Sequence, residues 1–364
     1  SPSMNELYRR LSSAVLSVAV FSFMFAVPLL AQDEEQEGPQ FEEWELKEIL
    51  PLLEVIRTAR AEQQPSFVTH EGVREVEEPF ELSTSFVKGT DGNTYVPYTL
   101  AIPLGHLAAS TVAVYVHIVE HEEAATTAEA DSEDAEMLEA LFEDAFYIDV
   151  DPTGEPEYLS RAFTVPGGDY DIYIAVRDST GPDADDDARE AAPVMMLSAE
   201  ITVPNLWSAS LATSSVLVAE TVEPLQVMLT PEEQLRFPYS LSNIRIEPKH
   251  DRNFVNQDEL SLMLLVYNPR LTSDGAPSIT VEYNFHKVAD GGAEEFFNKT
   301  TPQEFNADTL PPGFSVELGH QIVAGQSVPL TLFPAGSYRL EMIITDNESG
   351  STVTRNVAFM IGDG

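Results

Sequence analysis

The chain has 364 residues, a formal net charge of −42 at pH 7 and no cysteine. Such a negative charge repels phosphate backbones, which excludes nucleic acid as a partner and argues against anionic membrane surfaces. The lack of cysteine excludes disulfide cross-links, so apolar burial alone must hold the core, and a chain of this length has enough residues for that.

A targeting segment is predicted at the N-terminus. Arg9 and Arg10 precede an apolar stretch from Leu11 to Val27, and Ala31 is a small residue before an acidic run. This order is typical of a signal peptide. We therefore predict that residues 1–31 are a signal peptide and that the protein is secreted across the inner membrane, without stable membrane insertion after cleavage. An uncleaved anchor is the alternative, because the apolar run is near the lower length limit for spanning a bilayer.

Residues 32–65 are predicted to form an acidic linker and a short helix. Pro51 suits the first turn of a helix that ends near Gln64. We expect the helix to pack on the first β domain, and a partner-binding helix is the alternative. The apolar residues at helical spacing are Trp44, Ile49, Leu52, Leu53 and Ile56.

The first β domain is predicted over residues 66–204. Its clearest strand is the segment 112–118, in which every second residue is apolar, as in a strand with one buried face. Two acidic insertions, His121–Ala140 and Asp178–Glu190, interrupt the strands and are interpreted mainly as loops.

A pattern that occurs twice indicates that this domain is duplicated. Residues 166–178 and 334–346 share a Pro-x-Gly-x-Tyr turn and alternating apolar residues at a constant offset of 168 residues. Strands at 112–118 and 279–285 precede the two turns by similar distances. A tight turn, a tyrosine and an alternating strand are typical of the late hairpin of an immunoglobulin-like sandwich. We therefore predict an all-β fold class with two tandem immunoglobulin-like β-sandwiches, the second over residues 205–364.

Two aromatic features follow from this prediction. Tyr170 and Tyr338 occupy the same place in the two copies, where a tyrosine corner hydrogen-bonds the backbone a few residues upstream. We assign both a structural role. Phe305, Leu310 and Phe314 lie among turn residues in a polar connection. We expect this connection to fold over the end of the second sandwich, and a docking surface is the alternative.

Several short segments resemble known proteins. They are Val203–Trp207, Leu211–Val216, Phe297–Thr300, Phe305–Ala307, Thr309–Pro312, Gly319–Gln321 and Gly325–Leu330, together with the second hairpin. Over about residues 80–364 the chain resembles exported, largely uncharacterised acidobacterial-type proteins with tandem immunoglobulin-like modules, similar to the tails of von Willebrand factor A-related and GWxTD-domain proteins. The chain has neither a GWxTD motif nor an Asp-x-Ser-x-Ser adhesion motif. The resemblance therefore implies a fold, and no catalytic residues carry over.

One zinc motif occurs in the sequence. His117 and His121 match the H-x-x-E-H pattern of a metallopeptidase group, which requires a helix so that both histidines share a face. The alternation over 112–118 predicts a strand instead, on which the two histidines lie about 13 Å apart. We therefore expect no shared zinc ion.

The acidic runs raise calcium as an alternative cofactor. Asp183, Asp185, Asp186 and Asp187 offer the carboxylate oxygens that calcium needs. No Asp-x-Asp-x-Asp-Gly loop with a closing Glu accompanies them, so solvated loops are the preferred interpretation. We expect no cofactor and no metal, with calcium at these aspartates as the alternative.

Catalytic nucleophiles have no recognisable motif in this chain, which lacks both a Gly-x-Ser-x-Gly elbow and any cysteine. We predict an exported, non-enzymatic interaction or scaffolding protein of the bacterial envelope or surface, with a protein partner or with self-association. A carbohydrate-binding accessory module is the alternative, for which Tyr115, Tyr173 and Trp207 are the candidate exposed aromatics. A hydrolase with an unrecognised site is a further alternative.

Overall fold

A computed structural model describes residues 42–61, 67–69, 81–102, 108–121, 140–151, 157–192, 194–227, 229–241 and 244–362. These residues form a mainly β structure. The predicted signal peptide, the acidic linker up to residue 41 and most of the insertion after His121 lie outside them. None of the described helices is long and apolar enough to cross a membrane.

The chain divides into two compact units. The N-terminal unit contains the described residues of Leu29–Thr84 and Asn93–Asn205, and the C-terminal unit contains Leu206–Gly364 together with Ser85–Gly92. Inside the C-terminal unit, the short segment with strand β3 (Val87–Lys88) is held by hydrogen bonds such as that from Lys88 N to the Tyr267 hydroxyl, at 3.1 Å. The segment 85–92 thus belongs to the second unit, although the sequence placed it within the first domain.

The N-terminal unit contains two antiparallel sheets. One has the order β1-β9-β8-β5-β6, and in the other β2 and β7 flank β4. The rings of Phe142 from the first sheet and Phe163 from the second lie 5.9 Å apart, so the sheets face each other across a core. The strands are β1 (Phe67–Thr69), β2 (Glu81–Thr84), β4 (Thr94–Ile102), β5 (Thr111–Glu120), β6 (Phe142–Asp149), β7 (Glu157–Val165), β8 (Gly168–Asp178) and β9 (Val194–Val203).

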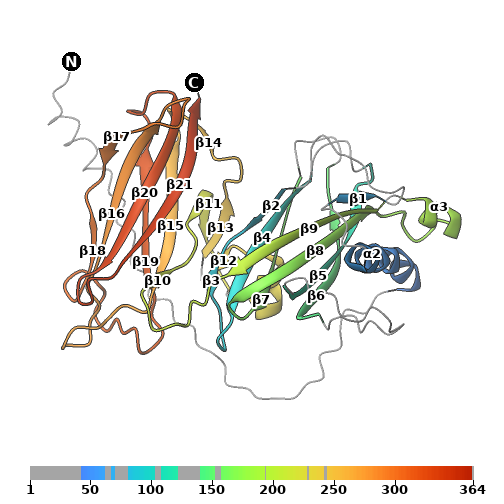
Figure 1. The fold of residues 1–364 in the computed structure, drawn as a ribbon, viewed down its shortest axis with the longest axis horizontal. Helices are drawn as coiled ribbons and strands as arrows, with labels where there is room; N and C mark the ends of the chain where they lie inside the picture. The colour runs from blue at the N-terminus through green and yellow to red at the C-terminus, as the bar shows by residue number, and fades with distance from the viewer. Residues whose placement is uncertain are drawn as a thin grey trace, which may run out of the picture. The chain divides into compact units, whose positions relative to one another are not determined.

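Helix α2 (Glu43–Ala61) covers the other face of the five-stranded sheet, which we call its outer face (Figure 1). Side chains spaced three and four residues apart on the helix are buried there, as an amphipathic helix requires. The helix contributes Ile49, Leu52, Ile56 and Ala59, and the sheet contributes Ala113, Tyr115, Ala175, Val194 and Met196.

The helix is longer than predicted. It begins at Glu43 and spans 19 residues, so Pro51 lies in its middle and not in its first turn. Proline there removes one backbone hydrogen bond. Burial of Ile49 and Leu52 on either side of Pro51 fixes both halves of the helix on the sheet, which outweighs that local cost.

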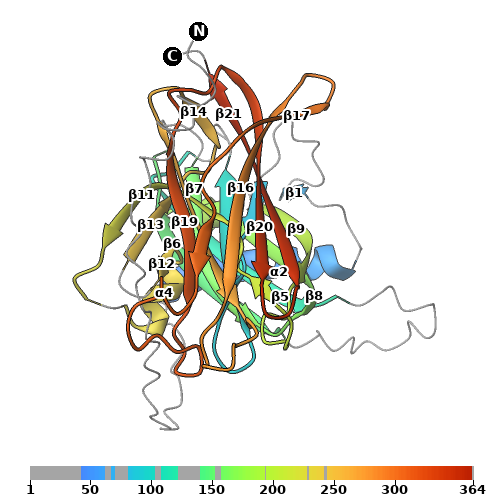
Figure 2. The same cartoon turned by 90° about the vertical axis from the view of Figure 1, so that its left-hand side faces the viewer.

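The C-terminal unit also has two sheets around one core. One has the order β10-β15-β11-β13-β12 with β19 beside β15, and the other has the order β14-β21-β20-β16-β17 with β18 beside β16 (Figure 2). Side chains of both sheets meet in a single apolar cluster. The elements are β10 (Ala212–Thr213), β11 (Leu217–Pro224), α4 (Pro231–Arg236), β12 (Ser240–Leu241), β13 (Ile244–Pro248), β14 (Asn253–Val255), β15 (Glu259–Tyr267), β16 (Ile279–Val288), β17 (Glu294–Lys299), β18 (Gln303–Phe305), β19 (Ile322–Pro329), β20 (Gly336–Asp346) and β21 (Thr352–Gly362).

The polar connection after β17 folds onto this core, as expected. Phe305 and Leu310 are buried in the apolar cluster, and Phe314 packs against it. Burial removes Phe305 and Leu310 from any docking surface, whereas Phe314 is partly buried.

The two units repeat the same strand pairing. In the N-terminal unit Val112 of β5 lies opposite Asp178 of β8, and in the C-terminal unit Ile279 of β16 lies opposite Asp346 of β20. From these pairs the two ladders continue residue for residue in step. The strands β9 and β21 flank β8 and β20 in the same way. The edges differ, because β1 is antiparallel to β9 whereas β14 is parallel to β21.

Equivalent outer faces carry different side chains. The repeated pairing places Thr280 and Glu282 where the N-terminal unit has Ala113 and Tyr115. It likewise places Thr354 where that unit has Met196. The C-terminal residues are partly or fully exposed, whereas their N-terminal counterparts are buried under α2. The apolar outer face therefore explains why α2 packs on the N-terminal sheet.

Two leucines of α2 test this packing. Leu52 is completely buried against the sheet, whereas Leu50 is 59% exposed. We expect Leu52→Ala to lower the free energy of unfolding of the N-terminal unit by about 2–5 kcal/mol, because it leaves a cavity. Leu50→Ala, in the same helix, is the matched control and should change it by less than about 0.5 kcal/mol. Chemical denaturation followed by circular dichroism measures both, and equal effects would contradict the packing.

Candidate functional site

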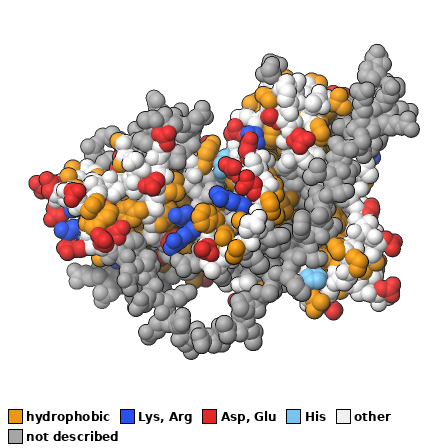
Figure 3. All heavy atoms as spheres, turned by 180° about the vertical axis from the view of Figure 1, so that it is seen from behind, with side chains coloured by type: hydrophobic (Ala, Val, Ile, Leu, Met, Phe, Trp, Pro, Cys, Tyr) orange, Lys and Arg blue, Asp and Glu red, His pale blue; other side chains and the backbone are white. Residues whose placement is uncertain are grey.

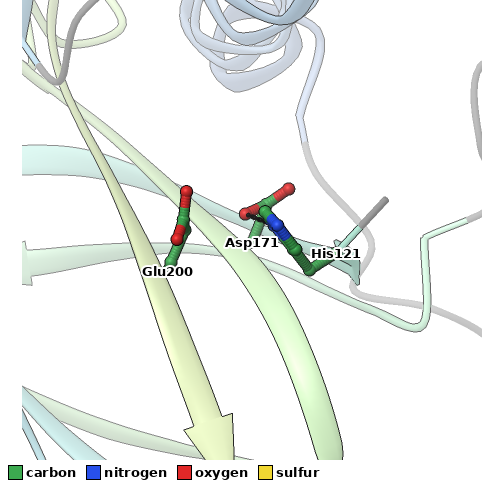
Figure 4. A group of neighbouring side chains, drawn as sticks. All are labelled: His121, Asp171 and Glu200. Carbon is green, nitrogen blue, oxygen red and sulfur yellow. Dashed lines mark hydrogen bonds and ion pairs between the residues drawn. The ribbon is translucent and has the colours of Figure 1, made fainter. Parts of the chain in front are cut away.

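Three side chains with metal-binding chemistry meet on the outer face of the N-terminal sheet. His121 directly follows β5, Asp171 lies on β8 and Glu200 lies on β9 (Figure 4). Asp171 and Glu200 are directly opposite each other in the β8–β9 ladder. The His121 N–H donates to Asp169 O at 2.9 Å, which extends the β5–β8 pairing by one step. The strand register therefore assembles this cluster, which we call the His–Asp–Glu cluster.

The cluster is compact and partly shielded from water. His121 Nδ1 donates to Asp171 Oδ1 at 2.8 Å, and the ligand atoms of all three residues lie within 4.8 Å of one another. The His121 and Asp171 side chains are 29% and 23% exposed, and Glu200 is exposed. A fourth carboxylate, Asp169, stands two residues before Asp171 on the same strand and accepts a hydrogen bond from Thr202 Oγ1 at 2.6 Å.

Negative charge surrounds the imidazole. The hydrogen bond to Asp171 raises the pKa of His121, and the charge of Asp171 raises it further, which outweighs the opposing effect of desolvation. Glu200 and Asp169 act in the same direction as Asp171. The cluster thus favours a cation at this position, either the protonated imidazole or a bound ion.

The equivalent positions of the C-terminal unit hold no such group. The shared pairing places Val288, Arg339 and Ala358 where the N-terminal unit has His121, Asp171 and Glu200. Arg339 itself pairs with Glu294, with Nη2 and Oε2 2.7 Å apart. The strand pairing shared by the two units therefore does not require a histidine and two acids at this end of the sheet.

The two histidines of the H-x-x-E-H motif lie on or next to a strand, as expected, and enter different clusters. His117 is buried under α2, where its Nδ1 donates to Glu143 Oε1 at 2.9 Å and its Nε2 accepts from Arg60 Nη1 at 3.2 Å. Tyr115 donates to the same Glu143 oxygen at 2.7 Å. Burial lowers the pKa of His117. Glu143 raises this pKa, but its effect is smaller than that of the lost hydration.

Two of the four aspartates considered for calcium make other local interactions. The segment predicted as a loop contains helix α3 (Asp186–Ala191), with Asp185 as its N-cap accepting from Ala188 N at 2.8 Å. Asp186 pairs with Lys47 Nζ at 3.1 Å, while Asp183 and Asp187 are exposed. Among the described residues these four aspartates do not gather into a metal-ligand group. On the face in Figure 3, acidic side chains stand at many separate places, as expected of a solvated acidic surface.

The candidate aromatics do not form an exposed row. Tyr115 is buried because α2 covers the face on which it lies, so its expected exposure was wrong. Tyr173 is partly buried in the same cluster. Trp207 is 44% exposed but belongs to the C-terminal unit, where Lys88 Nζ lies 4.4 Å from its ring centre.

Sequence reasoning missed a buried carboxylate that anchors α2. Glu48 is completely buried and accepts hydrogen bonds from the Thr180 N–H and hydroxyl, at 2.7 and 2.6 Å, and from Ser179 and Tyr147. Burial raises the pKa of a carboxyl, but these hydrogen bonds outweigh it and hold the Glu48 pKa below its ordinary value. The available signal was its spacing, since Glu48 stands four residues before buried Leu52 on the same helix face.

Both tyrosines of the repeat make the same upstream hydrogen bond. Tyr170 donates to Pro166 O at 2.9 Å, and Tyr338 donates to Pro334 O at 2.6 Å. Each spans four residues and closes the turn before β8 or β20. The expected hydrogen bonds are thus present in both units.

Comparison with known proteins adds little. The chain matches no family model and no curated protein. Among solved structures it is similar to Salmonella alpha-2-macroglobulin reacted with methylamine, at 11% identity and a TM-score of 0.19, over 80% of this chain and 17% of that one. It is also similar to Escherichia coli alpha-2-macroglobulin activated by porcine elastase, at 8% identity and a TM-score of 0.22, over 78% of this chain and 23% of that one. At these TM-scores the likeness has no bearing on fold or function.

The tyrosine hydrogen bonds lead to a stability prediction. Tyr170→Phe and Tyr338→Phe should each lower the free energy of unfolding of their unit by about 1 kcal/mol or more, because each variant loses the hydrogen bond of a buried tyrosine to the backbone. Tyr98→Phe is the control, since the buried Tyr98 hydroxyl has no hydrogen-bond partner in the described part of the chain, and its loss should be close to neutral. Denaturant unfolding measures all three, and a neutral result for both corner variants would contradict the assignment.

The two strand histidines should titrate in opposite directions. NMR titration in a chelating buffer should find the His121 pKa above, and the His117 pKa below, the ordinary value of about 6.5. The stabilisation that protonated His121 gains from Asp171 is present below the unfolded pKa and is lost as pH rises through the folded pKa. For His117 the folded-state pKa lies below the unfolded value, so the free energy of unfolding decreases as pH falls from about 6.5 toward the folded-state pKa.

Asp171→Asn gives the matched control for this titration. It removes the nearest negative charge, so the His121 pKa should fall toward its ordinary value, while the His117 pKa stays unchanged. A His121 pKa that is unchanged in this variant would show that Asp171 is not its partner.

Proposed function

We propose that this chain is an exported, non-enzymatic interaction or scaffolding protein of the bacterial envelope or surface, built from two tandem immunoglobulin-like β-sandwiches. The observation that carries the proposal is the repeated strand pairing of the two units, down to the tyrosine that closes each turn. Such sandwiches commonly present binding loops and faces on a rigid frame.

A repeated aspartate adds to the likeness of the two units. Asp178 ends β8 and accepts from Ala108 N and Ala109 N, at 3.0 and 3.1 Å. Asp346 ends β20 and accepts from Arg270 N at 2.9 Å. In each unit the carboxylate therefore fixes the loop that leads into the next strand, which is β5 in the N-terminal unit and β16 in the C-terminal unit. The two units thus agree in the turn before β8 or β20, in the strand register and in the loop that the aspartate holds. This agreement supports a duplicated module.

The C-terminal unit supports an interaction role through its open outer face. On this face Arg339 pairs with Glu294 and Glu341. Phe296 and Met360 are 55% and 49% exposed. Aromatic and methionine side chains with an arginine nearby are the types enriched in protein interfaces.

Fractionation and partner capture test the proposal. In the bacterium that makes it, the chain should be recovered with the envelope or the medium. The immobilised full chain should enrich a protein from envelope extracts that binds saturably when both are purified. Leu340→Asp places a charge in the C-terminal core, where Leu340 is completely buried, and serves as the folding control.

Two results would contradict the proposal. One is a chain for which no enriched protein binds saturably, with self-association also absent in sedimentation experiments. The other is substrate turnover by the purified chain, which would favour the hydrolase alternative.

A further inference from the structure

We propose that His121, Asp171 and Glu200 bind a divalent transition-metal ion, for which Zn²⁺ is the probe. One imidazole nitrogen and two carboxylates are a ligand set that suits zinc and its first-row neighbours. Calcium requires six to eight oxygen ligands, so this nitrogen-containing set does not suit it. The inference is independent of the proposed interaction role.

The geometry is close to that of a metal site. Ligands of a tetrahedral zinc ion lie about 3.4 Å apart, given metal–ligand distances near 2.1 Å. In the structure the histidine and aspartate atoms are 2.8 Å apart, and all three ligand atoms lie within 4.8 Å of one another. Asp171 and Glu200 are cross-strand neighbours held by the β8–β9 ladder, and the exposed Glu200 side chain has room to close the remaining gap.

The surroundings also favour an ion. Asp169 stands beside the cluster as a fourth carboxylate and is oriented by its hydrogen bond from Thr202. Such outer groups typically support metal ligands. A bound divalent ion would replace the proton now shared by His121 and Asp171 and would balance the excess of negative charge. Three protein ligands leave at least one coordination position open to water or to a donor atom of a partner.

The other unit shows that this cluster is not a by-product of the fold. The equivalent positions hold Val288, Arg339 and Ala358, among which none of the side chains suits a cation. The same pairing is thus achieved without the His–Asp–Glu cluster, so the scaffold does not account for its presence in the N-terminal unit.

Calorimetric titration of Zn²⁺ into the metal-stripped full chain tests the proposal. We expect one strongest site per chain, with an affinity that falls at least about tenfold in His121→Ala and in Glu200→Gln. His286→Ala is the matched control, because His286 also faces a carboxylate, with Nε2 and Glu341 Oε2 3.7 Å apart, but in the C-terminal unit. This control should bind Zn²⁺ like the unchanged chain, and millimolar Ca²⁺ should not compete.

Circular dichroism first confirms that each variant is folded. If His121→Ala does not fold, the result for Glu200→Gln alone tests the proposal. Zn²⁺ should also raise the melting temperature of the unchanged chain and of His286→Ala, and should raise that of Glu200→Gln by less at the same Zn²⁺ concentration. Zn²⁺ binding that is unchanged in both cluster variants, displacement by Ca²⁺, or no saturable Zn²⁺ site would overturn the proposal.

Discussion

The pairing register of β8 between β5 and β9 is the constraint on which the N-terminal unit depends. Side chains alternate between the two faces of a strand, so a slip by one residue would exchange every inward and outward side chain. In the observed register Ile172 and Ile174 enter the core, while Asp171 and Tyr173 point to the outer face. The same register places Asp171 opposite Glu200 and next to His121. The core, the surface for α2 and the candidate metal ligands therefore all follow from one set of backbone hydrogen bonds.

The two units show how one pairing scheme supports two surfaces. Alanine, tyrosine and methionine side chains make the outer face of the N-terminal sheet apolar, and α2 buries them. Threonine and glutamate at equivalent places keep the C-terminal face in contact with solvent. The apolar contact alone does not fix the position of α2 along the sheet. The hydrogen bonds of the buried Glu48 with Ser179 and Thr180 do so. Differences confined to outward positions leave the core pattern unchanged, which is why the repeat was visible in the sequence.

The sequence predicted those features that depend on neighbouring residues. Alternating apolar positions indicated the strands, and the Pro-x-Gly-x-Tyr turn indicated the hydrogen bond of each tyrosine. Features that depend on distant parts of the chain were missed or wrong. Pro51 was assigned to the first turn because local rules disfavour proline within a helix, whereas packing against the sheet holds the helix together around it. His121 and Asp171 are 50 residues apart in the sequence. The strand register brings them together, and a pattern of residue types along the sequence does not reveal that register.

Backbone NOEs across the strands test the central claim most directly. Because the register is claimed to be the same in both units, contacts should connect Val116 with Ile174 and Tyr283 with Met342. Two sets of NOEs in step with these pairs are the predicted result. A shift of one residue in either ladder would contradict the common register. In the β5–β8 ladder it would also turn Asp171 into the core and separate it from His121 and Glu200.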